Sequence, residues 1–300
     1  MTPDVATIGL TKSYGQTMAL RGLDLQVEAG QAYGFLGPNG AGKSTTIRLL
    51  LALQQPTSGH ASVVGVDPQR DPVTVHRQVG YLPGDLALYP RLTARRHIAW
   101  FAAARGLAGA AAVDLVDRFQ VDVDRPVREL SKGNRQKVGL VLAFLGRPRL
   151  VLLDEPTTGL DPLMQAEFEA LVRETVADGR TVFLSSHELD EVQRVCDRVG
   201  IIKEGMLVAD DTVEGLRRAA PRRITATFRR PPPEDCFARL TEARVVTRDG
   251  CTIELEVTGA LGPVLADIAR HDPVDLVSRP ADLDELFLRM YAGAEPSHVR

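Results

Sequence analysis

The sequence contains three cysteines in 300 residues, Cys196, Cys236 and Cys251, and none belongs to a Cys-x-x-Cys pair. Cysteines this sparse and widely spaced argue against a disulfide framework or a cysteine zinc site and are typical of a reducing compartment. The N-terminus lacks the basic-then-apolar segment of a secretory signal. Runs of about 18 uninterrupted apolar residues are also missing, so we expect no membrane span. If the protein serves a membrane process, another chain must cross the bilayer.

The charge balance is nearly neutral, and the sequence has no internal repeat. The formal net charge is −3, from 36 basic and 39 acidic residues. This balance gives little support for wholesale nucleic-acid binding, and we expect no nucleic-acid partner. Hydrophobic residues make up 44% of the chain, which is enough for a sizeable core. A length of 300 residues predicts one large or two modest domains.

A glycine-rich motif near residue 40 is the strongest chemical signal. It consists of consecutive residues: Gly37, Pro38, Asn39, Gly40, Ala41, Gly42, Lys43, Ser44 and Thr45. Two glycines separated by four residues and followed by Lys and Ser are typical of a P-loop. The apolar residues 32–36 predict a strand before the motif, and apolar residues at helical spacing over 47–53 predict a helix after it. This context disfavours a chance glycine-rich turn.

A P-loop between a strand and a helix is an anion-binding site. Its backbone N–H groups and the positive end of the helix dipole face a phosphate chain. Lys43 can reach the β- and γ-phosphates of a nucleotide, and the Ser44 hydroxyl can ligate Mg²⁺. The motif therefore predicts binding of a nucleoside triphosphate.

A pair of carboxylates follows a second buried strand. The apolar run Leu150–Leu153 is typical of a strand buried on both faces of a parallel sheet, and it ends in Asp154, Glu155 and Pro156. Two adjacent carboxylates at the carboxyl end of such a strand are costly unless they serve a site. Asp154 suits an outer-sphere role at Mg²⁺, and Glu155 suits activating water. The alternative is a solvated strand end.

Three weaker candidates leave alternatives open. Tyr14 lies in a turn shortly before the P-loop, where an aromatic ring either stacks on a base or closes the turn. Ser131 and Gly133 precede a helix predicted over 136–145, as a second anion-binding surface or an ordinary N-cap. His187 follows a β-branched strand, where ligand-facing groups gather in parallel sheets, although a lone His is usually structural.

The rest of the first 215 residues predicts alternating strands and helices. Residues 5–36 predict short, partly antiparallel strands, and residues 61–65 predict another. The segment from Leu92 and the Ala-rich stretch 102–116 predict a packed helical subdomain, because arginines interrupt its apolar face. Further elements are expected as helices over 168–176 and 189–196, a strand over 181–185 and a hairpin over 199–208.

The composition changes near residue 217, where arginines cluster and three prolines follow at 231–233. We interpret this segment as a junction with a solvated face rather than a lipid-binding patch. Residues 224–290 then predict a small α+β unit. Its expected strands lie over 224–228, 244–247 and 252–257, and its expected helices over 236–240, 264–269 and 282–291. The predicted domains are therefore 1–218 and 219–300.

In their order along the chain, these motifs resemble those of the ATP-binding subunits of ABC transporters, over about residues 5–215. Residues 37–45 resemble Walker A, and Leu150–Glu155 resembles Walker B with its catalytic glutamate. Residues 130–134 resemble the family signature, and residues 159–161 resemble the D-loop. Tyr14 is similar to the A-loop aromatic and His187 to the switch histidine. The resemblance implies an α/β P-loop fold of ABC type, with a parallel-sheet core, an antiparallel β subdomain and a helical subdomain, plus the small C-terminal α+β domain.

The resemblance also implies ATP and Mg²⁺ as cofactors, and a role for each matched residue. Tyr14 would stack on adenine, and Thr45 would contact a more distal phosphate oxygen. Ser44 and Asp154 would hold Mg²⁺. Glu155 would polarise the attacking water, and His187 would sense the γ-phosphate.

The family works as a head-to-tail dimer with two composite sites. Each site would join the P-loop of one copy to the signature of a second copy, through Ser131 and Gly133. Asp161 of the D-loop belongs to the same expected set of nucleotide-binding residues. ATP closes such a dimer and hydrolysis opens it.

Two departures from the family pattern point to one subgroup. Lys132 and Asn134 replace a Gly and the Gln of the usual Leu-Ser-Gly-Gly-Gln signature. The Q-loop glutamine is missing, and Gly84 and Asp85 stand in its place, with Asp85 as a candidate substitute. Both departures are similar to those of exporters that have ABC-2-type membrane subunits.

The expected function is therefore that of an ATP-binding and hydrolysing subunit that powers export of a drug or antibiotic, a lipid or an ion. Its partner would be an ABC-2-type transmembrane permease on a separate chain, and its location the cytoplasmic face of the membrane. A soluble ABC ATPase acting on ribosomes or nucleic acid is the alternative, but a single P-loop without sustained heptads disfavours it. An importer, or a regulatory or dimer-stabilising C-terminal domain, also stays open.

Overall fold

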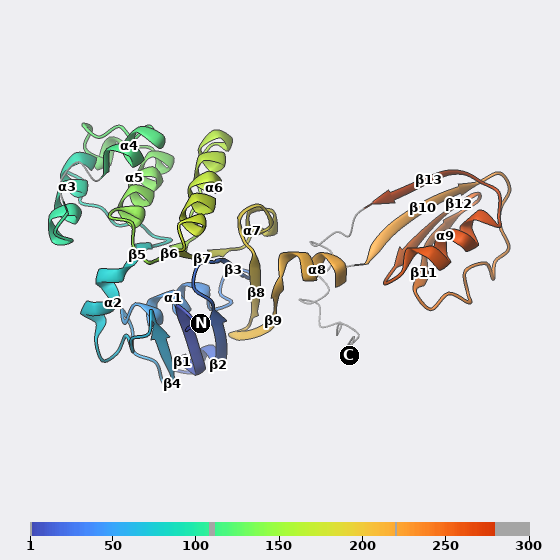
Figure 1. Ribbon diagram of the computed structural model, residues 1–300, viewed down its shortest axis with the longest axis horizontal. Helices are drawn as coiled ribbons and strands as arrows, with labels where there is room; N and C mark the ends of the chain where they lie inside the picture. The colour runs from blue at the N-terminus through green and yellow to red at the C-terminus, as the bar shows by residue number, and fades with distance from the viewer. Residues whose placement is uncertain (1, 108–111, 220, 280–300) are drawn as a thin grey trace. The chain divides into compact units, whose positions relative to one another are not determined.

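A computed structural model describes residues 2–107, 112–219 and 221–279 (Figure 1). The chain divides into two compact units, Met1–Asp211 and Thr212–Arg300. The boundary between these units precedes α8 (Val213–Ala219), whereas the sequence patterns predict a division after residue 218.

The first unit is built on a six-stranded sheet in the order β5-β6-β7-β3-β8-β9. The strands are β5 (Val79–Leu82), β6 (Leu150–Asp154), β7 (Thr181–Ser186), β3 (Ala32–Leu36), β8 (Arg198–Lys203) and β9 (Met206–Thr212). Pairing is parallel from β5 to β8. Every residue of β3, β6 and β7 is buried, as their apolar runs predict. The carboxyl ends of these three strands therefore meet at one edge of the sheet.

A three-stranded antiparallel sheet accompanies this core, in the order β2-β1-β4. Its strands are β1 (Val5–Tyr14), β2 (Thr17–Val27) and β4 (Ser58–Val63). The apolar side chains of this sheet pack with those of β3 and the first helix in one hydrophobic cluster. The antiparallel strands predicted over residues 5–36 are confirmed.

Seven α-helices are described in the first unit: α1 (Lys43–Leu50), α2 (Pro72–Gln78), α3 (Ala94–Ala104), α4 (Val113–Arg118), α5 (Lys132–Phe144), α6 (Pro162–Ala177) and α7 (Leu189–Val195). A 3₁₀ turn, η2, spans Val127–Glu129. In Figure 1, α3, α4 and α5 form a group beyond β5 and β6, which confirms a helical subdomain. The helical stretch expected over 102–116 is interrupted, because Gly106 adopts φ 68°, a left-handed conformation that ends α3, and its residues 108–111 lie outside the described residues.

The second unit is a four-stranded antiparallel sheet in the order β11-β12-β10-β13, with α9 (Leu261–Ala269) against it (Figure 1). The strands are β10 (Arg222–Phe228), β11 (Ala243–Asp249), β12 (Thr252–Val257) and β13 (Pro273–Arg279). The helix expected over 236–240 is wrong: this segment forms turns, and Phe237 is buried at φ 70°. β13 was not predicted, and the helix expected over 282–291 lies outside the described residues.

Within the described ranges, no helix combines the length and apolar character that a bilayer crossing requires.

Candidate nucleotide-binding and hydrolysis site

The P-loop connects β3 to α1 through a turn that only glycine can make at two positions. Gly42 is the N-cap of α1 and adopts φ 115°. A Cβ atom on Gly42 would lie 2.7 Å from the Ala19 carbonyl oxygen, and one on Gly37 would lie 2.6 Å from that of Ile202. No side chain caps α1. Its first backbone N–H groups are therefore available to an anion.

A cavity of about 320 Å³ opens at the start of α1. Its walls are formed by Ala19, Pro38, Asn39, Gly40, Gly42, Lys43, Ser44, Thr45, Gly84, Asp154 and Glu155. The fold thus brings most of the P-loop together with both predicted carboxylates. Gly37 and Ala41 support the loop from behind: the Gly37 N–H donates to the Ser186 carbonyl at 3.2 Å, and Ala41 is buried in the core.

Lys43 supplies a buried positive charge to this cavity. Its side chain is 5% exposed, and its Nζ forms an ion pair with Glu155 Oε1 at 3.3 Å. The same ammonium donates to the carbonyl oxygens of Gly37 and Pro38. A buried ammonium needs such compensation. A phosphate group is an alternative anionic partner for Lys43 in the same place.

Asp154 is held by the next strand of the sheet. Its carboxylate is almost fully buried, and the Ser185 hydroxyl of β7 donates to Oδ1 at 2.5 Å. On the other side is Gly84, where a Cβ atom would lie 3.1 Å from Asp154 Oδ2. Burial and the charge of Asp154 both raise the pKa of the neighbouring Tyr81 phenol. Asp154 therefore has one fixed orientation at the cavity wall.

Glu155 is held between two partners at the mouth of the cavity. One carboxylate oxygen faces Lys43, and the other, Oε2, is 2.6 Å from Nδ1 of His187. The backbone of Glu155 adopts φ 52°, which is unusual for a non-glycine residue and is often found at functional sites. The Gln136 side chain donates to the carbonyls of Glu155 and Pro156 at 3.2 and 3.0 Å and supports this conformation. The structure thus joins Glu155 and His187, which the sequence predicted separately.

The donor set fits a nucleotide with a magnesium ion. The cavity offers N–H groups and an ammonium for phosphates, and a hydroxyl and a carboxylate, Ser44 and Asp154, for the metal. Among the described residues, no group of three or more His, Cys, Asp or Glu side chains could hold a metal alone. Mg²⁺ commonly takes only one or two protein ligands and completes its shell with phosphates and waters.

The remaining predicted residues lie outside this cavity. Tyr14 is 44% exposed, its hydroxyl donates to Gln54 beyond the end of α1, and the Lys12 ammonium lies 5.1 Å from its ring centroid. Ser131 caps α5 by accepting from the Asn134 N–H at 3.2 Å. Asp161 caps α6 in the same manner.

The signature and the D-loop are in direct contact with each other. A Cβ atom on Gly133 would lie 2.4 Å from the Gly159 carbonyl oxygen, so only glycine fits at position 133. Because neither Ser131 nor Gly133 lines the phosphate cavity, the fold does not bring the P-loop and the signature together within one copy.

Comparisons with known proteins identify the family. The family model described as ABC transporter matches residues 20–158. The daunorubicin resistance ATP-binding protein DrrA2 of Streptomyces coeruleorubidus is 34% identical over 306 residues, which cover 94% of this chain and 92% of that protein. The chain belongs to the ABC transporter family. It is an ATP-binding subunit, and its enzymatic activity is that of an ATPase.

Two further relatives agree with this family assignment. The Nod factor export ATP-binding protein I of Burkholderia orbicola is 31% identical over 291 residues, which cover 93% of this chain and 94% of that protein. A solved structure of an ATP-binding subunit of an ABC transporter superposes with a TM-score of 0.67 at 34% identity, over 71% of this chain and 92% of that one. The ABC-type fold predicted from the sequence is confirmed.

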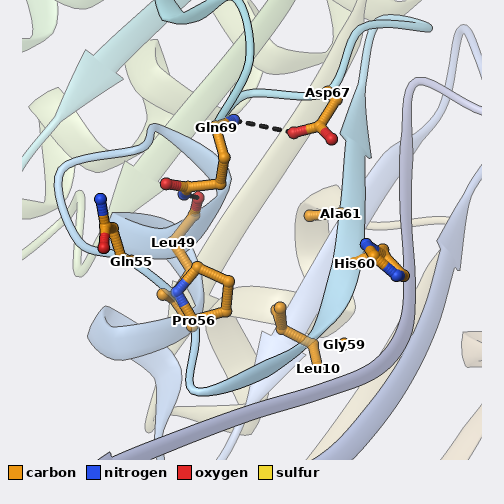
Figure 2. A pocket seen from close by; sticks show the side chains of 9 residues that line it. All are labelled: Leu10, Leu49, Gln55, Pro56, Gly59, His60, Ala61, Asp67 and Gln69. Carbon is orange, nitrogen blue, oxygen red and sulfur yellow. Dashed lines mark hydrogen bonds between the residues drawn. The ribbon is translucent and has the colours of Figure 1, made fainter.

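A second cavity of this ABC subunit, about 270 Å³ in volume, lies away from the P-loop, where the chain leaves α1 (Figure 2). The Gln69 backbone N–H donates to the Asp67 carboxylate at 2.9 Å (Figure 2). The Gln69 amide donates to the Gln54 carbonyl at 3.0 Å and so satisfies a backbone group beyond the end of α1. We assign this cavity a structural role.

Sequence reasoning missed several residues that shape the site of this ABC subunit. Ser185 orients Asp154, Gln136 supports Glu155, and Ala19 forms part of the cavity wall. Two consecutive serines at the end of an apolar strand were the available signal for Ser185. Gln136 and Ala19 carry no such signal, because their roles depend on contacts across the fold.

Proposed function

We propose that this ABC subunit hydrolyses ATP to power export of a small molecule through a separate membrane-spanning chain. The observation that most strongly supports this proposal is the position of Glu155 at the P-loop cavity, between Lys43 at 3.3 Å and His187 at 2.6 Å. The direction of transport is supported by relatives named for daunorubicin resistance and for Nod factor export. A drug or antibiotic is the substrate class that we favour, with lipids and ions as the alternatives.

The chain's own residues bind the nucleotide in this proposal. Lys43 and the N–H groups of the P-loop hold the phosphates, and Thr45 contacts a more distal phosphate oxygen. Ser44 and Asp154 hold Mg²⁺, whose positive charge stabilises the phosphate oxygens during hydrolysis. Tyr14, half exposed near the end of β1, presents a ring that can stack on adenine.

Glu155 acts as the general base. Its carboxylate accepts a proton from the attacking water, and His187, through Nδ1, keeps the carboxylate in place. Loss of a positioned general base typically lowers a rate by 10²–10⁴-fold. Asp85 is exposed and does not line the cavity, so it offers no direct replacement for the missing Q-loop glutamine.

A second copy of the chain completes the site. Ser131 and Gly133 lie at the exposed start of α5, away from the P-loop cavity of their own copy. In a head-to-tail dimer, this surface and Asp161 would face the nucleotide held by the other copy. Binding would close the dimer, and hydrolysis would release it.

The permease partner is tested by copurification. The tagged chain is expressed in its own cells, solubilised gently in detergent and analysed by mass spectrometry. We expect a polytopic ABC-2-type membrane protein in comparable amount, which would also locate the chain at the cytoplasmic face of the membrane. Ribosomal proteins, or a wholly soluble pool without a partner, would instead support the soluble ABC ATPase and contradict the export proposal.

A further inference from the structure

A buried carboxylate lies directly behind the candidate site and has no role in the proposal above. Glu191, in the first turn of α7, is only 3% exposed. The Ser186 hydroxyl donates to its Oε2 at 2.5 Å, and the Glu188 N–H donates to the Ser186 Oγ at 3.0 Å. Burying a carboxylate in this way costs free energy, so we expect Glu191 to have a role in the local structure or chemistry.

Ser186 connects Glu191 to both sides of the phosphate cavity. Its carbonyl oxygen accepts from the N–H of Gly37, the first residue of the P-loop, at 3.2 Å. It is followed directly by His187, the partner of Glu155. The hydrogen bond from Ser186 to Glu191 therefore fixes the strand end that supports the P-loop and carries His187.

The surroundings of Glu191 favour its neutral form. Burial raises its pKa from an ordinary carboxyl value to about 7, and the carboxylates of Glu155 and Glu188 act in the same direction. The hydroxyls of Ser186 and Thr157 oppose this shift. At the end of the same helix, burial and the nearby charge of Glu191 raise the pKa of the Cys196 thiol.

The other elements packed on α7 contribute little charge to this position. From α6, Glu169 forms its ion pair with Arg194 at 2.7 Å, on the exposed side of α7. From β3, the contact is apolar: a Cβ atom on Gly34 would meet the side chain of Val192. The carboxylates of Glu155 and Glu188 thus remain the main charges acting on Glu191.

The phosphates of a nucleotide shift this balance toward the protonated form, and MgADP keeps a net negative charge near neutral pH although Mg²⁺ offsets part of the effect. Lys43 pairs with Glu155 in the structure, and a phosphate chain bound to the P-loop competes for that ammonium. The phosphates also bring net negative charge next to the Ser186 turn. Both effects raise the free energy of the ionised Glu191 carboxylate relative to its protonated form.

We propose that Glu191 is a positioning residue of the ATPase site, which holds the Ser186 turn and, in the molecules where it is still ionised, takes up a proton from solution when a nucleotide binds. The proton adds to the carboxylate and no other bond changes. The inference rests on the proposed binding of nucleotide by the P-loop. In this account the protein exchanges a buried negative charge for the negative charge of its ligand.

Calorimetry measures the number of protons that the protein takes up when the nucleotide binds. MgADP is titrated into the full-length chain near pH 7, in buffers that differ in ionisation enthalpy, and the same titration is done with Glu191→Gln. Subtracting the proton uptake of the variant from that of the wild type removes the contribution of the ligand and of other groups. We expect wild type to take up about 0.4 proton more per nucleotide than Glu191→Gln, as a half-ionised carboxyl does when its pKa rises by one unit.

The pH dependence of affinity gives a second readout. The ratio of the wild-type Kd to the Glu191→Gln Kd should increase by roughly eightfold between about pH 6 and pH 9 for the same one-unit shift. Asp190→Asn is the matched control: it removes an exposed carboxylate from the same turn of α7 and should keep the wild-type proton uptake.

The outcomes separate this inference from the proposed function. Absence of MgADP binding to the wild type would overturn the P-loop assignment itself. Normal binding with equal proton uptake in wild type and Glu191→Gln would overturn only the role of Glu191. If Glu191→Gln does not fold, infrared difference spectra of the wild type decide: a protonated-carboxyl C=O band must appear on MgADP binding, and its absence contradicts the inference.

Discussion

The bond between Ser185 and Asp154 gives the most specific prediction about the metal site. The Ser185 hydroxyl is fully buried and donates to Asp154 Oδ1 at 2.5 Å, while Asp154 itself is only 4% exposed. Ser185→Ala leaves this carboxylate without that donor and free to rotate. A hydrogen bond to a charged group contributes about 1.5–3 kcal/mol, so we expect a loss of unfolding free energy of this size in metal-free buffer.

The effect on magnesium should be equally distinct. Removing the partner that orients a metal ligand typically lowers metal affinity or activity by about 10–100-fold. We therefore expect the Mg²⁺ concentration for half-maximal ATPase activity to rise by about tenfold or more in Ser185→Ala. Urea unfolding measures the stability, and a magnesium titration of ATP hydrolysis measures the affinity.

Thr181→Val is the matched control at the other end of the same strand. The Thr181 hydroxyl is also buried and donates to a buried carboxylate, Asp4, at 2.6 Å. We expect both variants to lose similar stability, but only Ser185→Ala to change the magnesium dependence. Equal magnesium dependence in Ser185→Ala, Thr181→Val and wild type would refute the assignment of Asp154 to the metal.

Three other variants test separate parts of the account. The folded-state pKa of Glu191 is raised to about 7, so the contribution of Glu191 to wild-type stability should fall by at most about 3 kcal/mol as pH rises from about 4.5 to 7. Glu191→Gln should remove that contribution, so the difference in unfolding free energy between wild type and variant should change with pH in urea unfolding, and parallel curves would contradict it. Gly133→Ala forces a Cβ atom to within 2.4 Å of the Gly159 carbonyl, and should lower ATPase activity by up to about 100-fold without weakening MgADP binding. Gly262→Ala, which meets nothing within 4 Å, is its control and should keep wild-type activity. Lys43→Ala should abolish nucleotide binding in calorimetry, and unchanged affinity would exclude its phosphate contact.

The sequence predicted those parts of the fold that depend on local patterns. The P-loop needs glycine at fixed positions between a strand and a helix, and the spacing of the apolar residues predicts both this strand and this helix. The buried strand before Asp154 and Glu155 is likewise a continuous apolar run. Parallel sheets bring the carboxyl ends of their strands to one edge, so His187 could be expected near Glu155.

The failures occurred where tertiary contacts override local patterns. Phe237 and Leu240 are three residues apart, as on one face of a helix, but they pack on the core from a segment that is not helical. Glu191 looks like an ordinary polar residue of a surface helix, and only the packing of α7 reveals that it is buried against Ser186. Such residues take their role from partners that are distant in sequence, and local periodicity contains no information about them.

The roles of Tyr14, Ser131, Gly133 and Asp161 stay predictions, because each of them lies outside the phosphate cavity of its own copy. Their proposed ligand contacts depend on the nucleotide base or on a second copy of the chain. The short distance between Gly133 and the Gly159 carbonyl nevertheless links the signature to the D-loop within one copy.

The central claim is that Glu155 accepts the proton of the attacking water, and Glu155→Gln tests it most directly. The amide keeps the size of the side chain but cannot act as a base. The account predicts that the variant binds ATP with nearly wild-type affinity, accumulates as an ATP-bound dimer, and hydrolyses ATP about 10²–10⁴-fold more slowly in a single turnover. Hydrolysis at the wild-type rate, with ATP bound normally, would contradict the assignment of Glu155 as the base.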